Sequence, residues 1–177
     1  MTVTGVQVSA EQMQERVARF KGLRPSRQAF VDTRIPEHVR DIYNVIGKGV
    51  TEDPDLKPAI TAVEGFNITY VGAESGKGAA LHSHSTVEVF IPLSGRWSVF
   101  WGDEGENEVI LDTFDCVSVP VGILRGFRNV GEGHAYLMAI LGGTDAGKVG
   151  WAKSVLERAE QTGLALDDAG NVVELAE

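Results

Sequence analysis

The stretch GKGAALHSHSTVEVFIPLSG, residues 76–95, decides the fold and carries the most informative side chains of the chain. His82, His84 and Glu88 lie within it at H-x-H-x3-E spacing. In an extended strand alternate side chains point the same way, so these three positions share one face and can converge. Two imidazoles and one carboxylate are the donor set of a 2-His-1-carboxylate metal site. Glycines at both ends of the stretch indicate turns that bend the chain around a small pocket.

The composition is that of an ordinary globular protein, with 177 residues, 43% hydrophobic and 23% charged. This length predicts one domain with a substantial core. The net charge of -9, without a basic stripe, argues against binding nucleic acid or anionic membranes. Cys116 is the single cysteine, which excludes an intrachain disulfide and a cysteine-rich zinc site. No apolar run approaches the roughly 20 residues of a membrane span, and no signal peptide is evident, so we expect a cytoplasmic protein.

Helical patterns stand at the two ends of the chain and strand patterns in the middle. A capping box at Ser9 and Gln12 opens the first predicted helix. The predicted helices cover residues 9–22, 36–46 and 151–163. The strand-like runs, broken by Gly, Pro and Asp, are residues 66–71, 87–93, 97–101, 108–111, 116–119, 127–130 and 135–141. Many short strands with no helix between them predict an all-β sandwich or small barrel.

The spacing of these residues resembles the two motifs of the cupin superfamily. The first motif is matched throughout by Gly76, His82, His84, Glu88 and Gly95. The second motif is matched in part by Pro120, Gly122, Arg125 and Asn129. Arg125 stands where the family has its fourth metal ligand, a histidine, and Phe114 stands where it has a leading glycine. The resemblance covers about residues 76–129.

The resemblance implies a single-domain cupin, which is a jelly-roll (double-stranded β-helix) barrel, here with flanking N- and C-terminal α-helices. We expect a helical extension packed on the barrel over residues 1–58, the β-barrel over residues 59–143, and a C-terminal helix and tail over residues 144–177. It also implies one divalent transition metal (Fe, Mn, Ni or Zn) held by His82, His84 and Glu88. A homodimer that pairs through the outer face of a barrel sheet is expected by the same analogy.

Arginine at position 125 leaves three interpretations of the site open. A guanidinium has no lone pair, so Arg125 cannot be a metal ligand, and at about 5 Å it repels a divalent ion by roughly 6–7 kcal/mol at an effective dielectric near 20. In the first interpretation the trio still binds metal, and Arg125 anchors an anionic substrate through its planar fork. In the second, Arg125 pairs with Glu88 and leaves a metal-free pocket. In the third, Arg125 turns outward to a neighbouring carboxylate.

Aromatic residues are further candidates for a substrate pocket. We predict that Phe90 and Trp97 bind substrate together with Arg125, with packing in the core or at a dimer interface as the alternative. Cys116, in a strand-like run, is expected to be a small buried hydrophobe.

Two functions fit these features. One is a mononuclear-metal enzyme that acts on a small anionic or aromatic molecule by the oxygenation, isomerisation or lyase chemistry of the proteins it resembles. The other is a non-catalytic cupin, with or without a metal, that binds a small ligand with Arg125 as counter-charge.

Overall fold

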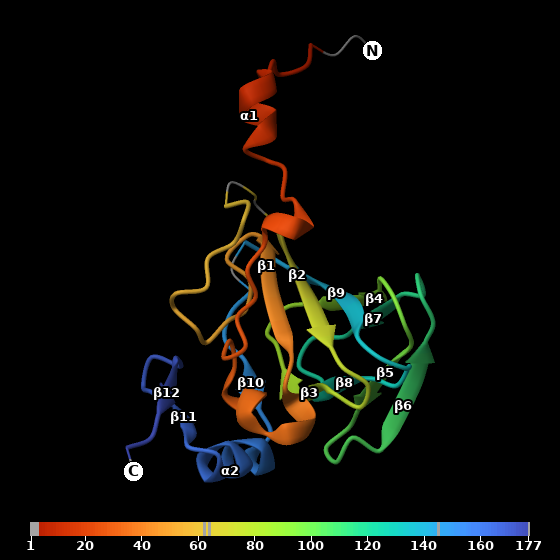
Figure 1. Ribbon diagram of the computed structural model, residues 1–177, viewed down its shortest axis with the longest axis vertical. Coiled ribbons are helices and arrows are strands. Elements are labelled where there is room, and N and C mark those ends of the chain that lie inside the picture. Colours follow the sequence, from red (N-terminus) through yellow and green to blue (C-terminus); the bar gives the residue numbers. More distant parts are fainter. Residues whose placement is uncertain (1–3, 62, 64, 145, 177) are drawn as a thin grey trace.

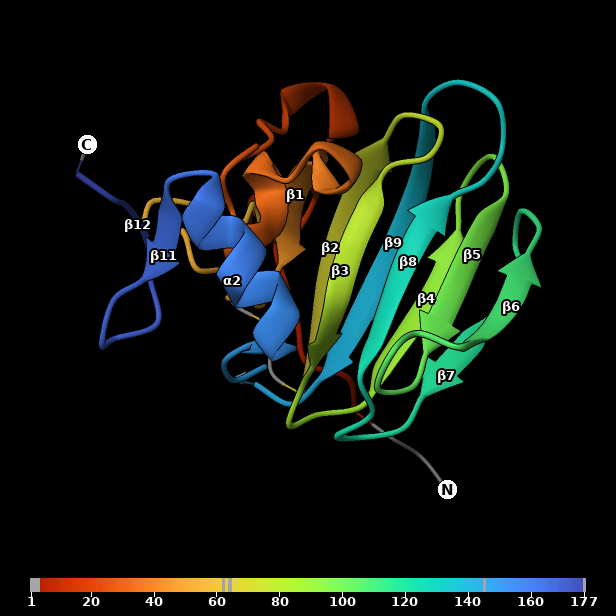
Figure 2. The same ribbon diagram turned by 90° about the horizontal axis from the view of Figure 1, so that it is seen from below.

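The chain forms two five-stranded antiparallel sheets that face one another (Figures 1 and 2). The structure is a computed structural model that describes residues 4–61, 63, 65–144 and 146–176, so a few positions of the predicted segments lie outside the described residues. The first sheet, in spatial order, comprises β1 (Asp41–Ile46), β2 (Phe66–Ala73), β9 (Ala135–Gly142), β4 (Glu88–Pro92) and β7 (Val117–Val119). The second comprises β10 (Gly150–Trp151), β3 (Gly78–Ser83), β8 (Arg125–Asn129), β5 (Trp97–Trp101) and β6 (Asn107–Leu111).

The strand order is that of a jelly roll. The orders β2-β9-β4-β7 and β3-β8-β5-β6 place strands that are distant in sequence next to each other, and the chain passes repeatedly from one sheet to the other. In Figure 2 the strands of the two layers overlap and run in similar directions. The predicted all-β jelly roll is confirmed, and the motif that suggested it lies on β3 and β4, which are neighbours of the central strands β8 and β9 of the two sheets.

The core lies between the sheets and follows from strict alternation along the strands. In β9 the side chains of Ala135, Leu137, Ala139 and Leu141 are buried, while those between them are half-buried on the outer face. Trp97 and Phe90 are among the largest buried side chains of the same core. Burying one large aliphatic or aromatic side chain contributes roughly 1.5–3 kcal/mol, so this interior supplies most of the stabilisation that orders the site.

The segment predicted as a second helix is a strand instead. Pro36–His38 forms a single 3-10 turn, η3, and β1 follows it and pairs with β2. Asn44 fixes this pairing, because its side chain donates to the carbonyl of Lys48 and accepts from the hydroxyl of Thr69. The apolar positions of β1 fit a helical stripe and a strand equally, and pairing with a long neighbouring strand decides between them. The helical prediction for residues 36–46 is wrong, and the first sheet begins inside the expected N-terminal extension.

The N-terminal helix starts as predicted and is shorter than predicted. α1 (Ala10–Gln14) has the capping box: the Gln12 N–H donates to the Ser9 hydroxyl over 3.1 Å, and the Ser9 N–H donates to the Gln12 side chain over 2.9 Å. None of its residues is buried, and Figure 1 shows it standing apart from the sheets. A helix without a packed apolar face is marginal at this length. The chain meets the sheet again at η1 (Phe20–Gly22), where Phe20 packs on Tyr136 with ring centroids 5.1 Å apart.

The C-terminal helix is confirmed as α2 (Lys153–Gln161), and a short hairpin that the sequence did not predict follows it. The elements of this flank are η2 (Val31–Arg34), α2, β11 (Leu164–Leu166) and β12 (Val172–Glu174). They join in a small cluster of Val31, Ala159 and Leu164 beside the main core.

Cys116 is exposed, so its prediction as a buried residue is wrong. Over the described residues no helix is long and apolar enough to cross a membrane.

Candidate functional site

The three residues of the predicted trio meet in the space between the two sheets. His82 lies near the end of β3, His84 directly beyond it, and Glu88 opens β4. Ligand atoms of the three side chains all lie within 4.8 Å of one another. The exposed fractions are 6% for each histidine and 3% for Glu88. The convergence expected from their spacing is present, whereas their role as metal ligands stays a prediction.

A backbone carbonyl holds the His82 ring in one tautomer. Nδ1 of His82 lies 2.7 Å from the carbonyl oxygen of Ala80. A carbonyl only accepts hydrogen bonds, so Nδ1 donates and Nε2 keeps its lone pair. Burial, with a smaller contribution from Arg125, holds the pKa of His82 well below its ordinary value. His82 is therefore neutral near pH 7 and has the tautomer of a metal ligand that bonds through Nε2.

His84 is the less constrained of the two imidazoles. Burial, again with a contribution from Arg125, lowers the pKa of His84 to about 3. Nε2 of His84 lies 3.9 Å from Oε1 of Glu88, which is too long for a hydrogen bond. Nδ1 is buried and, among the described residues, has no hydrogen-bond partner. A buried ring nitrogen without a partner costs free energy, and among the described residues no group fixes the tautomer of this ring as the Ala80 carbonyl does for His82.

Arg125 points inward and pairs with Glu88. Nε and Nη2 of Arg125 both donate to Oε2 of the carboxylate, over 3.0 and 2.5 Å. Nη1 donates to the carbonyl oxygens of His82 and Ile123 over the longer distances of 3.3 and 3.4 Å. Arg125 is only 1% exposed. The interpretation in which Arg125 turns outward is wrong, and the pairing with Glu88 is present.

The geometry of this pair leaves one carboxylate oxygen for another partner. Both Arg125 bonds reach Oε2, so Oε1 of Glu88 faces His84 without competition from the guanidinium. Burial raises the pKa of Glu88, while the charge and hydrogen bonds of Arg125 lower it. Burial is the larger effect, so the pKa of Glu88 is raised overall, and the two hydrogen bonds from Arg125 to Oε2 favour the charged carboxylate against it.

The donor set fits a divalent metal ion with three protein ligands. Two neutral imidazoles and one carboxylate oxygen are a set that transition metals accept, with positions left over for small molecules. The charges of Glu88 and Arg125 cancel, so the protein does not neutralise the charge of such an ion. His84 also lacks the outer hydrogen-bond partner that metal-bound histidines usually have. The residues therefore fit a metal that binds reversibly better than one that is locked in place.

A cavity of about 40 Å³ opens beside the trio. Besides the trio, its lining residues include Phe30, Arg40, Thr69, Phe127 and Trp151. Space of this size holds a few water molecules and is smaller than a benzene-binding cavity of about 150 Å³. The cavity at the imidazoles thus takes water or a very small molecule, and an organic ligand must place its body elsewhere.

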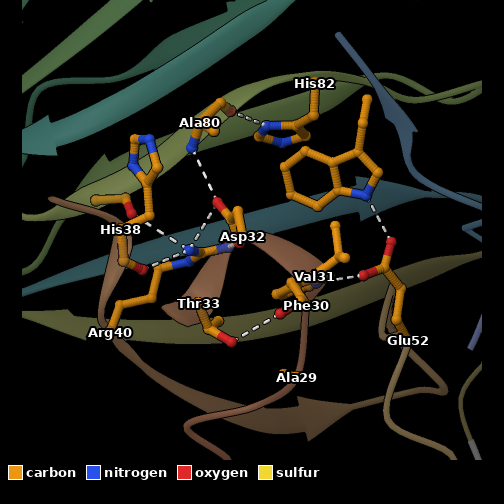
Figure 3. A network of polar contacts seen from close by, with 12 residues as sticks. Ala29, Phe30, Val31, Asp32, Thr33, His38, Arg40, Glu52, Ala80 and His82 are labelled. Atoms are coloured by element: carbon orange, nitrogen blue, oxygen red, sulfur yellow. Dashed lines mark hydrogen bonds and ion pairs between the residues drawn. The ribbon is translucent and has the colours of Figure 1, made fainter. Parts of the chain in front are cut away.

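A second buried ion pair supports the strand that carries His82. Figure 3 shows Asp32 between Arg40 and the backbone of Ala80. Oδ2 of Asp32 accepts from Nη1 of Arg40 and from the N–H of Ala80, each over 3.0 Å. Asp32 and Arg40 are 0% and 4% exposed. The ion pair fixes the backbone at Ala80, and this backbone in turn fixes the tautomer of His82.

Glu52 holds an indole ring against His82. Oε1 of Glu52 accepts from Nε1 of Trp151 over 2.6 Å, and Oε2 accepts from the N–H of Val31 over 2.6 Å. The ring centroids of Trp151 and His82 are 5.4 Å apart. Burial raises the pKa of Glu52 to about 7. The supporting residues that sequence reasoning missed are Asp32, Arg40, Glu52 and Trp151; they come from separate segments, and no spacing signal joins them.

The aromatic residues predicted to bind substrate lie in the packed core. Phe90 and Trp97 are each 0% exposed, and their rings pack against Phe127 with centroid distances of 5.1 and 6.0 Å. Neither lines the cavity beside the trio. Trp101, four residues along the strand from Trp97, lines a second cavity together with Arg125. Substrate binding by Phe90 and Trp97 stays a prediction, and their packing agrees with the alternative of a core role.

Comparison with known families agrees with the motifs. Residues 69–141 match the family model described as a cupin domain, a range that contains the trio and Arg125. The chain therefore contains a cupin domain, as the resemblance of its motifs predicted. A search of curated protein sequences gives no match.

Solved structures of low sequence identity share the fold. The polyketide cyclase RemF from Streptomyces resistomycificus is 11% identical, with 76% of this chain and 82% of that chain covered and a TM-score of 0.56. A conserved protein with a double-stranded β-helix domain from Klebsiella pneumoniae is 17% identical, with 84% and 99% covered and a TM-score of 0.54. A cupin 2 conserved barrel domain protein from Rhodopseudomonas palustris is 14% identical, with 80% and 88% covered and a TM-score of 0.53. These likenesses show the fold alone.

Proposed function

We propose that the protein is a mononuclear-metal cupin that acts on a small organic molecule. The observation that carries this proposal is the buried trio, in which His82 is neutral and presents Nε2 while Glu88 presents Oε1. His82, His84 and Glu88 would hold one divalent transition metal. Such an ion, when bound, would activate a small co-substrate or polarise the substrate as a Lewis acid.

The remaining residues of the site have supporting roles in this proposal. Arg125 stabilises the charge of Glu88 and offers a cation to an anionic substrate. Trp151 and the two neighbouring sheets keep bulk water away from the imidazoles, which strengthens electrostatic interactions at the centre. The likeness in fold to a polyketide cyclase is compatible with a small organic substrate. The reaction class, oxygenation, isomerisation or lyase chemistry, stays a prediction of the family resemblance, as does a cytoplasmic location.

Metal analysis of the purified protein tests this proposal. Protein made without added chelator should contain close to one equivalent of iron, manganese, nickel or zinc, or take up one equivalent when titrated anaerobically. His82→Ala should lose this metal, because one of only three ligands is gone. His134→Ala is the matched control, since His134 is exposed and bonds Glu74. A wild-type protein that holds no metal and binds none would refute the proposal.

A metal-free ligand-binding protein is the second candidate, and one observation favours it. Arg125 occupies the place of the fourth ligand and already neutralises Glu88, so the site is balanced in charge without a metal. In that case the same titration gives no metal uptake, and a small anionic ligand binds equally well in the presence of a strong chelator. The two candidates thus predict opposite results in one experiment.

We also propose that two copies pair through the outer face of the first sheet. Tyr70, Met138 and Ile91 lie in register across β2, β9 and β4, half-buried on this apolar face. Large apolar patches on an outer surface are typical of interaction sites. Light scattering should give the mass of a dimer for the wild type and of a monomer for Met138→Lys, with Ile110→Lys on β6 as control. A wild-type monomer would contradict the proposal.

A further inference from the structure

We propose that the cavity lined by β5, β6, β7 and Arg125 binds a small molecule that has an apolar body and one anionic group, and that this binding is coupled to the metal. The proposal rests on the proposed function, since the coupling needs an ion at the trio. The cavity measures about 420 Å³. Its lining residues are Val99, Trp101, Val109, Val117, Ser118, Val119, Pro120, Ile123 and Arg125.

Size is the first argument that the organic ligand lies here. The cavity beside the imidazoles measures about 40 Å³, and the cavity beyond Arg125 is about ten times larger. A cavity of about 150 Å³ suffices for benzene, and small-molecule sites commonly measure 300–1,000 Å³. Of these two cavities, the one beyond Arg125 is therefore the one that accommodates an organic body of several carbon atoms.

The lining is the second argument, because it selects for an apolar body with a single charge. Valine, isoleucine, proline and tryptophan form nearly the whole wall. Of the described lining residues, Arg125 is the one that carries a charge. A few well-placed polar groups in an apolar wall fix the orientation of a ligand. The planar guanidinium matches a carboxylate better than a hydroxyl or an amide.

Arg125 lies between the two cavities and has bonding capacity to spare. Its guanidinium has five N–H groups. Four of them donate hydrogen bonds, two to Glu88 and two longer ones to carbonyl oxygens. The carbonyl of Ile123, at 3.4 Å, is the weakest of these acceptors, and Ile123 itself lines the cavity. An anionic group could replace this neutral acceptor while Glu88 keeps its two bonds.

Charge balance couples this binding to the metal. Without a metal, Glu88 neutralises Arg125, and an added anion would bring an unbalanced negative charge into a buried place. A divalent ion at the trio leaves the site positive, so the same anion then becomes favourable. Binding free energies couple reciprocally, so the anion must also tighten metal binding by the same factor.

Calorimetric titration of metal-depleted and zinc-loaded protein tests the inference with three probes. Benzoate has both features, benzyl alcohol has the apolar body alone, and inorganic phosphate has the charge alone. Benzoate should bind about tenfold or more tightly to the zinc-loaded protein. Benzyl alcohol should bind at least about tenfold more weakly than benzoate, since a charge-assisted hydrogen bond is missing. Equal affinity of benzoate in both forms, or no benzoate binding to zinc-loaded protein, would overturn the inference.

A blocking variant locates the bound probe. Val109→Trp fills the cavity and should abolish benzoate binding while zinc still binds, since Val109 lies on β6 and does not line the cavity at the trio. Ile110→Trp is the matched control, because Ile110 is the next residue of the strand and is 39% exposed. If Val109→Trp does not fold, Val117→Trp replaces it. Benzoate binding that survives the folded blocking variant would refute this site. Failure of zinc uptake in the wild type would instead refute the proposed function.

Discussion

Removal of the arginine that pairs with Glu88 should destabilise the protein in a way that depends on pH. Arg125→Met keeps an unbranched side chain similar to the aliphatic part of arginine and removes the charge and the two bonds to Oε2. Breaking a buried pair by removing one partner costs about 3–5 kcal/mol of unfolding free energy, because the other charge stays buried alone. Arg125 is 1% exposed and Glu88 3%, so solvent does not screen the loss. We expect this full loss at pH 8, with the metal removed.

At pH 5 the loss should be smaller. Burial raises the pKa of Glu88 and Arg125 lowers it, so without Arg125 the carboxyl binds a proton more readily and the unpaired charge disappears. Arg125 also lowers the pKa of His82 and His84, so its removal lets these rings charge at a less acidic pH, with the same sign of effect. The folded variant therefore binds more protons than the folded wild type, and its deficit shrinks as pH falls.

Urea denaturation of both proteins at pH 5 and pH 8, with a chelator present, measures this difference. Arg128→Met is the matched control: Arg128 lies on the same strand, is exposed, and has its guanidinium 5.4 Å from the centroid of Phe100. The control should lose less than about 1 kcal/mol at either pH. A deficit of the Arg125 variant that is the same at both pH values, or no larger than that of the control, would refute the argument from the buried pair.

Two further changes have defined outcomes. Phe114 has a φ of 71° and is 78% exposed. In urea denaturation Phe114→Gly should raise the unfolding free energy by about 0.5–1 kcal/mol, because the backbone strain that it relieves exceeds the entropy that glycine adds to the unfolded chain. A loss of stability would contradict this. Burial raises the pKa of Glu52 from 4.5 to about 7, so its stabilisation is complete below about pH 4.5 and is lost as pH rises through about 7. The wild type should therefore lose about 3 kcal/mol relative to Glu52→Gln between pH 4.5 and pH 8, and parallel stability curves of the two proteins would count against a buried, titrating Glu52.

The sequence predicted the part of the site that is local and missed the part that is not. His82, His84 and Glu88 come from one strand and the start of the next, so the alternation of side chains along a strand is enough to bring them together. Arg125 was placed near them by motif spacing, and its direction had to come from the fold, because an arginine can reach several partners from one position. The strand β1 was mistaken for a helix because its apolar spacing serves both structures.

The residues outside the motif that support the site could not be predicted from the sequence, and the reason is physical. Glu52 lies in a segment whose charges and prolines are typical of a solvated loop, and its burial follows from contacts with Trp151, which lies 99 residues away along the chain. Asp32 likewise meets Ala80 over 48 residues. Pairings of this kind depend on the packing of the flank formed by the chain ends against the sheets, which periodicity does not encode. Phe114 is a different case: the family pattern has glycine there, and Phe114 has the positive φ that favours glycine.

Arg125, in the place where the family has a histidine, changes the charge balance of the metal-free site. With a fourth histidine, the metal-free site would contain a buried carboxylate with no cation beside it, and metal binding would relieve that cost. Here Arg125 already relieves it through two hydrogen bonds, so the metal-free protein is electrostatically complete. Under the proposed function, the metal should therefore contribute less to folding, and its affinity should depend more on an additional anion. In that proposal, the arginine at the place of the fourth ligand suits the site to an anionic ligand, because metal and ligand then bind best together.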